Sequence, residues 1–160
     1  MLVGDDNIVQ QKHYKSNYSF NGAPGMSNSP TVSSGTQAFS FNFTPKLSNS
    51  VIYLESSCHT MYETANHGDM AFILAYYDST VITINYTPIS YTIGTLNFAV
   101  PVLQGSCNSW GTTQKTIGIR FGMSGSGVYY NRAMDYPAQH GGANGNNYIY
   151  YTVREVAYCF

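Results

Sequence analysis

The chain has 160 residues, a formal net charge of −1 and only 9% charged residues, far below the roughly 25% of an ordinary soluble domain. Its seven lysines and arginines are scattered along the sequence, which argues against nucleic acid as a partner. No apolar run approaches the roughly 18 residues of a membrane-spanning helix, and the first ten residues lack the basic and apolar regions of a secretory signal. We therefore expect one domain without membrane insertion.

Polar uncharged residues and glycine take the place of the missing charges, and the chain contains 15 tyrosines. Hydroxyl and amide groups then solvate the surface in place of charged groups. This composition suits a surface that buries against copies of the same chain, or one that contacts sugars and cell surfaces.

Extended segments separated by turns follow one another along the chain. Residues 7–20 are a polar stretch that is either a first strand or the end of a connecting stalk, and residues 21–35 are a loop of turn formers. Phe39, Phe41 and Phe43 then alternate with polar residues, which indicates a half-buried strand. Further strands are expected at residues 51–60, 70–77, 81–93, 96–103, 116–123, 128–134 and 148–158, with loops at residues 61–69 and 105–114.

These segments predict an all-β, jelly-roll-like antiparallel β-sandwich, because eight or nine strands are expected and no convincing helix. Residues 1–20 are expected to form an N-terminal arm or stalk junction, and residues 21–160 the sandwich. The last strand carries bulky groups on both faces, so we expect it at the centre of a sheet and covered on both sides. Several other strands share this property, which predicts that a neighbouring subunit covers the second face.

The chain resembles the C-terminal, receptor-binding tip domains of tailed-bacteriophage tail fibre proteins. Residues 39–57, FSFNFTPKLSNSVIYLESS, resemble a strand–turn–strand pattern of these domains, and residues 133–156, AMDYPAQHGGANGNNYIYYTVREV, resemble their ending. The opening IVQQKHYK resembles their usual start. The matching positions are Val9, Gln10, residues 43–45, residues 50–54, Asp135, Pro137, Tyr148 and Val153.

The resemblance implies a homotrimeric tip on a virion tail fibre, joined to an upstream fibre or virion protein. Such a tip folds in the host cytoplasm and acts outside the cell, by non-catalytic, multivalent attachment to a host cell-surface glycan or outer-membrane receptor. Val51 stands where the family usually has lysine, and the loop after Pro137 is unusually rich in glycine and asparagine, so no shared ligand is implied. The alternatives are a structural virion protein, such as a capsid decoration or fibre-assembly domain, and a stand-alone carbohydrate-binding lectin module.

The sequence offers little for catalysis or for a cofactor. Its eight carboxylates are not paired as in glycoside hydrolysis, and no GxSxG nucleophile motif is present, so we do not expect an enzyme. Glu55, Glu63 and Asp69 fall around one loop with His59 and His67, but their spacing matches no metal motif. We therefore expect no metal and no cofactor.

The three cysteines are far apart and form no CxxC pair. Cys58 alternates with Ile52 and Leu54, which indicates a small buried side chain. A disulfide between Cys107 and Cys159 is the less favoured interpretation of the other two, since we expect folding in a reducing compartment.

Recognition is the function that the aromatic composition favours. Aromatic rings stack on the apolar faces of sugars and anchor protein interfaces, while neighbouring amides and arginines bind polar groups. Three loops offer this mixture, and for each tyrosine the alternative role is packing at a trimer interface. The candidate receptor-binding residues are Trp110, Tyr129, Tyr130, Asn131, Arg132, His140 and Asn144.

Overall fold

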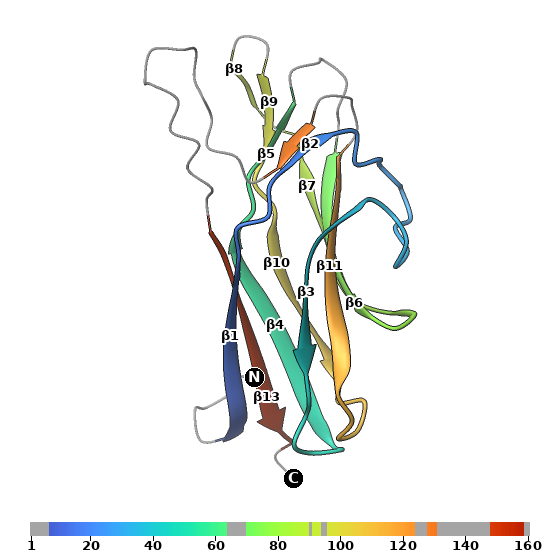
Figure 1. Ribbon diagram of the computed structural model, residues 1–160, viewed down its shortest axis with the longest axis vertical. Helices are drawn as coiled ribbons and strands as arrows, with labels where there is room; N and C mark the ends of the chain where they lie inside the picture. Colours follow the sequence, from blue (N-terminus) through green and yellow to red (C-terminus); the bar gives the residue numbers. More distant parts are fainter. Residues whose placement is uncertain are drawn as a thin grey trace.

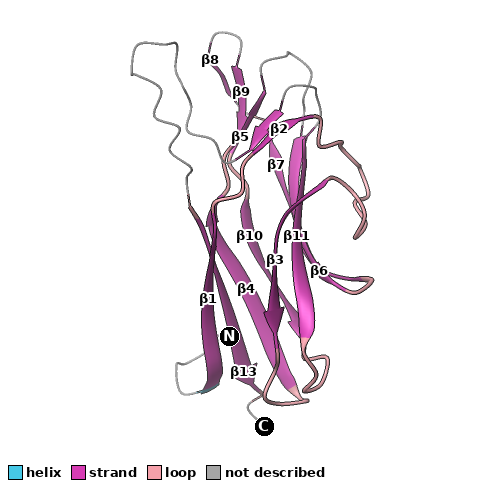
Figure 2. Cartoon of the chain, in the orientation of Figure 1, coloured by secondary structure: helices cyan, strands magenta, loops and turns pink. Residues whose placement is uncertain are grey.

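A computed structural model describes residues 7–63, 70–89, 91–93, 96–123, 128–130 and 148–158. These residues form thirteen strands and no α-helix (Figure 2). No helix in this part of the chain is long and apolar enough to cross a membrane.

Two four-stranded antiparallel sheets pack face to face and form a β-sandwich (Figure 1). The first sheet has the strand order β1 (Ile8–Ser16), β13 (Ile149–Ala157), β4 (Ser50–Cys58) and β10 (Val102–Asn108). The second sheet has the order β3 (Thr36–Phe43), β11 (Lys115–Met123), β6 (Met70–Tyr77) and β7 (Thr80–Pro88). The predicted all-β, jelly-roll-like antiparallel sandwich is therefore confirmed.

A smaller third sheet lies at one end of the sandwich, at the top of Figure 1. We call it the end sheet. Its five short strands follow the order β2 (Phe20–Gly22), β12 (Val128–Tyr130), β5 (Met61–Glu63), β9 (Leu96–Ala99) and β8 (Tyr91–Ile93). Strand β5 lies where a loop was predicted.

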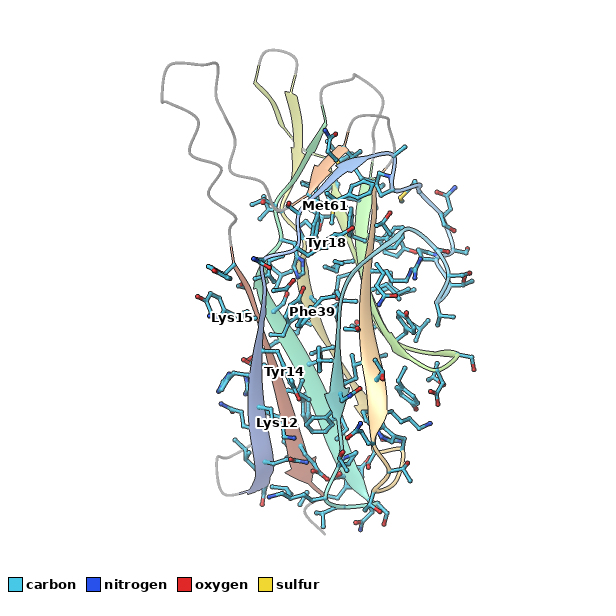
Figure 3. All side chains as sticks on the ribbon, in the orientation of Figure 1. Lys12, Tyr14, Lys15, Tyr18, Phe39 and Met61 are labelled. Atoms are coloured by element: carbon cyan, nitrogen blue, oxygen red, sulfur yellow. The ribbon has the colours of Figure 1, made fainter. Side chains whose placement is uncertain are left out.

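The core between the two large sheets is formed by every second residue of each strand, whose side chains point inward. Ile52 and Leu54 of β4 are buried, as are Ile117, Ile119 and Phe121 of β11. Aromatic contacts connect the sheets: the ring of Tyr14 stacks on Phe41 with centroids 4.1 Å apart, and Phe39 stacks on Tyr151 at 5.2 Å. Figure 3 shows Tyr14 and Phe39 in the space between β1 and β3.

The outer face of the second sheet is covered by the chain itself. Phe72 on that face is fully buried, and a Cβ on Gly122 would lie 2.2 Å from the Phe72 ring and 2.5 Å from the carbonyl oxygen of Gly25. The Arg120 guanidinium donates to the carbonyl oxygens of Ser34 and Gly35, both at 2.8 Å. The loop at residues 23–35 thus covers this face, so the predicted neighbouring subunit is not needed there.

Strand β13 is central in its sheet, as predicted, but only one of its faces is covered within the described chain. Tyr151 and Val153 point into the core and are fully buried, whereas Tyr148 and Tyr150 on the other face are 51% and 56% exposed. The described residues therefore leave this second face of β13 uncovered, and its cover by a neighbouring subunit stays a prediction.

The N-terminal stretch is a strand and not a stalk over residues 8–16. Strand β1 pairs with β13 from Ile8 to Ser16, with one bulge, and its Gln10 side chain donates to the Thr44 carbonyl oxygen at 2.8 Å. The first of the two interpretations of this stretch is the one observed, and this part of the predicted arm belongs to the sandwich.

Candidate functional site

The outward face of the first sheet, which we call the open face, is not covered by any described segment. Antiparallel register places residues of the four strands in rows across this face. One row is mainly apolar, and the two rows next to it are mainly polar. The residues of each row are given in the strand order β1, β13, β4, β10. The first row is Ile8, Val156, Val51 and Asn108; the second is Gln11, Arg154, Tyr53 and Ser106; the third is His13, Thr152, Glu55 and Gln104.

A hollow of about 180 Å³ lies in the part of this face formed by β13, β4 and β10. Its polar lining comes from Tyr53, Glu55, Gln104 and Arg154, and its apolar lining includes Ile8 and Val156. The hollow therefore combines an aromatic ring, opposite charges, an amide and aliphatic groups.

An ion pair between Arg154 and Glu55 spans two adjacent strands in this hollow. Arg154 lies directly opposite Tyr53 and Glu55 directly opposite Thr152, so the pair is diagonal across the sheet. Both side chains are partly exposed, at 37% and 45%. A pair with this exposure contributes little to folding stability, which leaves its groups available for a ligand.

The wall of the hollow on the β10 side is fixed by β7 of the second sheet. The backbone N–H of Gln104 donates to Asn85 Oδ1 at 3.1 Å, and Thr83 Oγ1 donates to the Gln104 carbonyl oxygen at 3.0 Å. A Cβ on Gly105 would lie only 2.3 Å from the Cβ of Thr83. Residue 105 must therefore be glycine for β7 and β10 to approach this closely.

A second aromatic group lies further along the open face. The rings of Tyr148 and Tyr150 are 6.5 Å apart, and the Lys15 ammonium group is 5.1 Å from the centre of the Tyr148 ring. Next to them, His13 Nδ1 and Thr152 Oγ1 form a hydrogen bond of 3.1 Å. This group offers rings and a positive charge without a carboxylate.

The inner side of the first sheet holds the open face in place through Glu155. Its buried carboxylate accepts hydrogen bonds from the backbone N–H groups of Lys46 and Leu47, both at 2.8 Å, from Ser50 Oγ at 2.7 Å and from Gln10 Nε2 at 2.6 Å. Desolvation raises the pKa of Glu155, but the four donors outweigh it and the pKa is lowered. Glu155 thus connects β13, β1 and the β3–β4 turn.

His59 forms a second buried polar group beneath this sheet. His59 Nδ1 is 2.6 Å from the Tyr130 hydroxyl, and Nε2 is 2.7 Å from Ser56 Oγ. Burial lowers the pKa of His59 to about 3, so the ring is neutral. Ser56 Oγ also accepts the Leu103 N–H at 3.1 Å. With both ring nitrogens engaged and no exposed surface, His59 has a structural role.

Metal-ligand clusters are not found in the described residues. Of the loop considered above, His67 and Asp69 and the side chain of Glu63 lie outside those residues. The Cys107 thiol is free, and burial raises its pKa to about 11, while the side chains of Cys58 and Cys159 lie outside the described part.

The structure contradicts the prediction of Tyr130 as a receptor contact. Tyr130 has no exposed surface; its ring stacks on Phe121 with centroids 3.9 Å apart, and burial raises its pKa. A strand was predicted here, with Tyr130 as a receptor contact, but β12 turns this side chain into the core. The backbone of Tyr129 pairs with Asn21 and Tyr62 in the end sheet. Its side chain is not described, and Asn131, Arg132, His140 and Asn144 lie outside the described residues.

Trp110 is a partly buried residue that packs against the sandwich core. Its ring lies 4.6 Å from that of Tyr77 and 6.1 Å from that of Phe43, both on the second sheet. Its indole N–H donates to the Thr113 carbonyl oxygen at 3.0 Å. Trp110 therefore orders the β10–β11 connection, and the structure does not bring it together with the hollow.

Sequence reasoning missed the hollow. The alternation of residues 51–58 places Tyr53 and Glu55 on one face, and that of residues 148–158 places Arg154 on one face. The register that brings these faces together is set by pairing across 99 residues, for which the sequence has no local signal. Gln104 was placed beside a predicted loop, although β10 continues to Asn108.

No protein-family model and no curated protein matches the chain. Among solved structures it is similar to dimeric latent PorU from Porphyromonas gingivalis, with a TM-score of 0.41, 7% identity, and coverage of 94% of this chain and 13% of that one. It is also similar to the structure of infectious bursal disease virus Gx strain, with a TM-score of 0.39, 12% identity, and coverage of 94% and 38%.

A mutant VP2 protein of infectious bursal disease virus, in derived T=1 particles, gives a TM-score of 0.40 and 15% identity, with coverage of 94% of this chain and 37% of that one. The chain therefore spans only 13% to 38% of the length of these proteins. At TM-scores of this size the likenesses support no conclusion about function.

Proposed function

We propose that the chain is the distal domain of a phage tail fibre and that it attaches to a host surface receptor by non-catalytic binding through the open face. The observation that carries the proposal is the hollow with the Glu55–Arg154 pair and Tyr53, on a sheet face that no described segment covers. Aromatic rings next to polar side chains are the groups that recognition sites use.

The arrangement of the two segments that resemble tail fibre domains also supports the proposal. Residues 43–54 and 148–156 are far apart in sequence, yet β4 and β13 pair side by side. Glu155 accepts the N–H groups of Lys46 and Leu47 in the turn after Pro45. The described parts of these two segments thus form one structural unit, which contains two of the strands that line the hollow.

Assembly into a homotrimer is part of the proposal. Three weak sites on one tip raise avidity without a tight single contact. Tyr148 and Tyr150, more than half exposed, offer apolar area for contact with a neighbouring copy while the hollow stays accessible. Light scattering over a range of concentrations is expected to give a mass near three times 17.6 kDa. A stable monomer would refute the trimer.

Binding of the fluorescently labelled chain to a panel of bacterial strains tests the attachment function. We expect saturable binding to at least one strain, and a loss of at least tenfold in bound protein when Tyr53 and Arg154 are both replaced by alanine. Tyr86→Ala is the matched control, because Tyr86 is 42% exposed, against 38% for Tyr53, and lies on the second sheet. Equal losses from the two variants, or no binding to any strain, would count against the proposal.

A structural virion protein is the second candidate, favoured by the exposed Tyr148–Tyr150 group and the adjacent Lys15. These residues form a surface suited to contact with another virion protein. Such a protein would bind capsids or fibre segments and leave bacterial cells unlabelled, so the same binding experiment distinguishes the two candidates.

A further inference from the structure

We propose that the hollow on the open face binds one neutral saccharide residue, with the Glu55–Arg154 pair acting as a combined donor and acceptor for sugar hydroxyls. This inference rests on the proposed attachment function, because it names the ligand class for the same face. It concerns a site on the sheet surface, away from the loops in which sequence reasoning placed the receptor contacts.

The dimensions of the hollow suit a single small ring. Its volume is about 180 Å³, below the roughly 300 Å³ at which sites for drug-sized ligands begin. Ile8 and Val156 provide an aliphatic surface, and Tyr53 provides a partly exposed aromatic ring. A pyranose has an apolar face of C–H groups that packs on such surfaces, while its hydroxyls remain at the rim.

The polar groups match the hydrogen-bonding character of hydroxyls. Arg154 uses one Nη2 donor toward Glu55 Oε1, and a guanidinium carries five N–H donors in all. The Glu55 carboxylate has about four acceptor positions. Gln104 adds an amide with both functions. Each sugar hydroxyl donates and accepts, so two neighbouring hydroxyls can donate to Glu55 and accept from Arg154.

The charge balance selects against an anionic ligand. The positive charge of Arg154 is already compensated by Glu55, so a carboxylate or phosphate in the hollow would meet Glu55 as well as Arg154. An uncharged ligand avoids this repulsion and can use both partners. The site is thus expected to favour neutral sugars over uronic or sialic acids.

The site is also largely formed before a ligand binds. Asn85 and Thr83 hold the backbone of Gln104 through hydrogen bonds of 3.1 and 3.0 Å, and Thr83 packs against Gly105. A preformed wall reduces the entropy that binding costs. A ligand of one ring still gives only a dissociation constant on the order of 1 mM, which fits multivalent attachment.

NMR titration of the whole chain with methyl glycosides tests the proposal. The probes are the methyl α-glycosides of glucose, galactose, mannose and N-acetylglucosamine, with methyl glucuronoside and N-acetylneuraminic acid as the anionic set. We expect at least one neutral probe to bind with a dissociation constant on the order of 1 mM and to shift the amide signals of Tyr53, Gln104 and Arg154. Tyr53→Ala is expected to weaken binding about five- to tenfold, and Tyr86→Ala to leave it unchanged.

The variant Glu55→Gln provides a readout that a merely structural role would not change. It keeps the size and hydrogen-bonding capacity of residue 55 but leaves the Arg154 charge uncompensated. We expect the affinity ratio of glucuronoside to glucoside to rise at least tenfold, and the matched control Asp78→Asn, in the exposed pair with Lys115, to leave the ratio unchanged. A constant ratio in Glu55→Gln would overturn the charge argument.

The outcomes separate this inference from the attachment function. Binding to bacterial cells without binding of any neutral probe would refute the saccharide site and leave the attachment function standing. Sugar binding with shifts confined to residues around Trp110 would refute this location. Preference of the unaltered chain for the anionic probes would refute the ligand class, and absence of binding to both cells and sugars would refute both proposals.

Discussion

The outer faces of the two large sheets both carry bulky side chains, but these side chains are buried on one face and partly exposed on the other. On the second sheet, Phe72 and Leu74 are fully buried, and the loop at residues 23–35 covers the face through Arg120. On the first sheet, Tyr53 and Tyr150 stay partly exposed. Tyrosine can keep its hydroxyl in water while its ring lies on the sheet, whereas phenylalanine and leucine cannot. The side-chain chemistry therefore differs between the part of the second sheet around Phe72, which the loop covers, and the open face, which the chain presents.

The strongest test of this comparison is truncation of one aromatic residue on each face. Phe72→Ala removes a fully buried ring beneath the loop and is expected to lower the free energy of unfolding by about 3–5 kcal/mol. Tyr150→Ala, 56% exposed on the open face, is expected to change it by at most about 0.5 kcal/mol. Urea unfolding followed by tyrosine and tryptophan fluorescence measures both. Similar losses in the two variants would mean that the open face is covered in solution.

The variant Glu155→Gln tests whether the buried carboxylate stabilises the first sheet, whose outward side is the open face. Each carboxylate oxygen of Glu155 accepts one backbone N–H: Oε2 that of Lys46 and Oε1 that of Leu47. In Glu155→Gln the amide nitrogen must therefore face an N–H donor in either orientation. We expect a loss of about 2–4 kcal/mol in the free energy of unfolding.

The lowered pKa of Glu155 also has a pH consequence. Its stabilising contribution is present above the unfolded-state pKa of 4.5 and is lost as the pH falls through the lower, folded-state pKa. The unaltered chain should lose stability in that range, and Glu155→Gln should lack this component. An unfolding free energy in Glu155→Gln equal to that of the unaltered chain would contradict the role given to this carboxylate.

The alternation of residues predicted the fold and much of the core. The alternation of phenylalanines with polar residues predicted a half-buried strand, and Phe41 and Phe43 are buried. The cover of the second sheet could not be predicted, because the turn formers of residues 21–35 have no pattern that indicates packing on Phe72. Tyr130 was assigned as a receptor contact because aromatic, amide and arginine side chains stand together at residues 129–132. Its hydrogen bond to His59, 71 residues away, depends on tertiary structure.

His59 gives a further, pH-dependent effect beneath the open face. Burial lowers its folded-state pKa from 6.5 to about 3. The unfolded chain therefore binds a proton below pH 6.5 that the folded chain does not. Stability should fall by up to about 1.4 kcal/mol per pH unit between pH 6.5 and pH 3. Between pH 6.5 and pH 5 this slope is separate from the contribution of Glu155.

His59→Gln should remove the slope between pH 6.5 and pH 5, whereas His13→Gln, an exposed histidine of the open face, should keep it. Chemical unfolding at four pH values in this range measures the difference. A flat stability profile in the unaltered chain would show that His59 is accessible to protons in the folded state.

A small effect on stability is also expected for the pair on which the binding proposal depends. Arg154 and Glu55 are 37% and 45% exposed, so replacing both by glutamine should change the free energy of unfolding by less than about 1 kcal/mol. The same double variant should lower the affinity for neutral glycosides several-fold, because one charged donor and one charged acceptor become weaker neutral groups. If the pair had only a structural role, the double variant would lose more than about 1 kcal/mol of unfolding free energy. Its affinity for neutral glycosides would then be unchanged. A large loss of binding with little loss of stability is therefore the result that separates a presented face from a covered one.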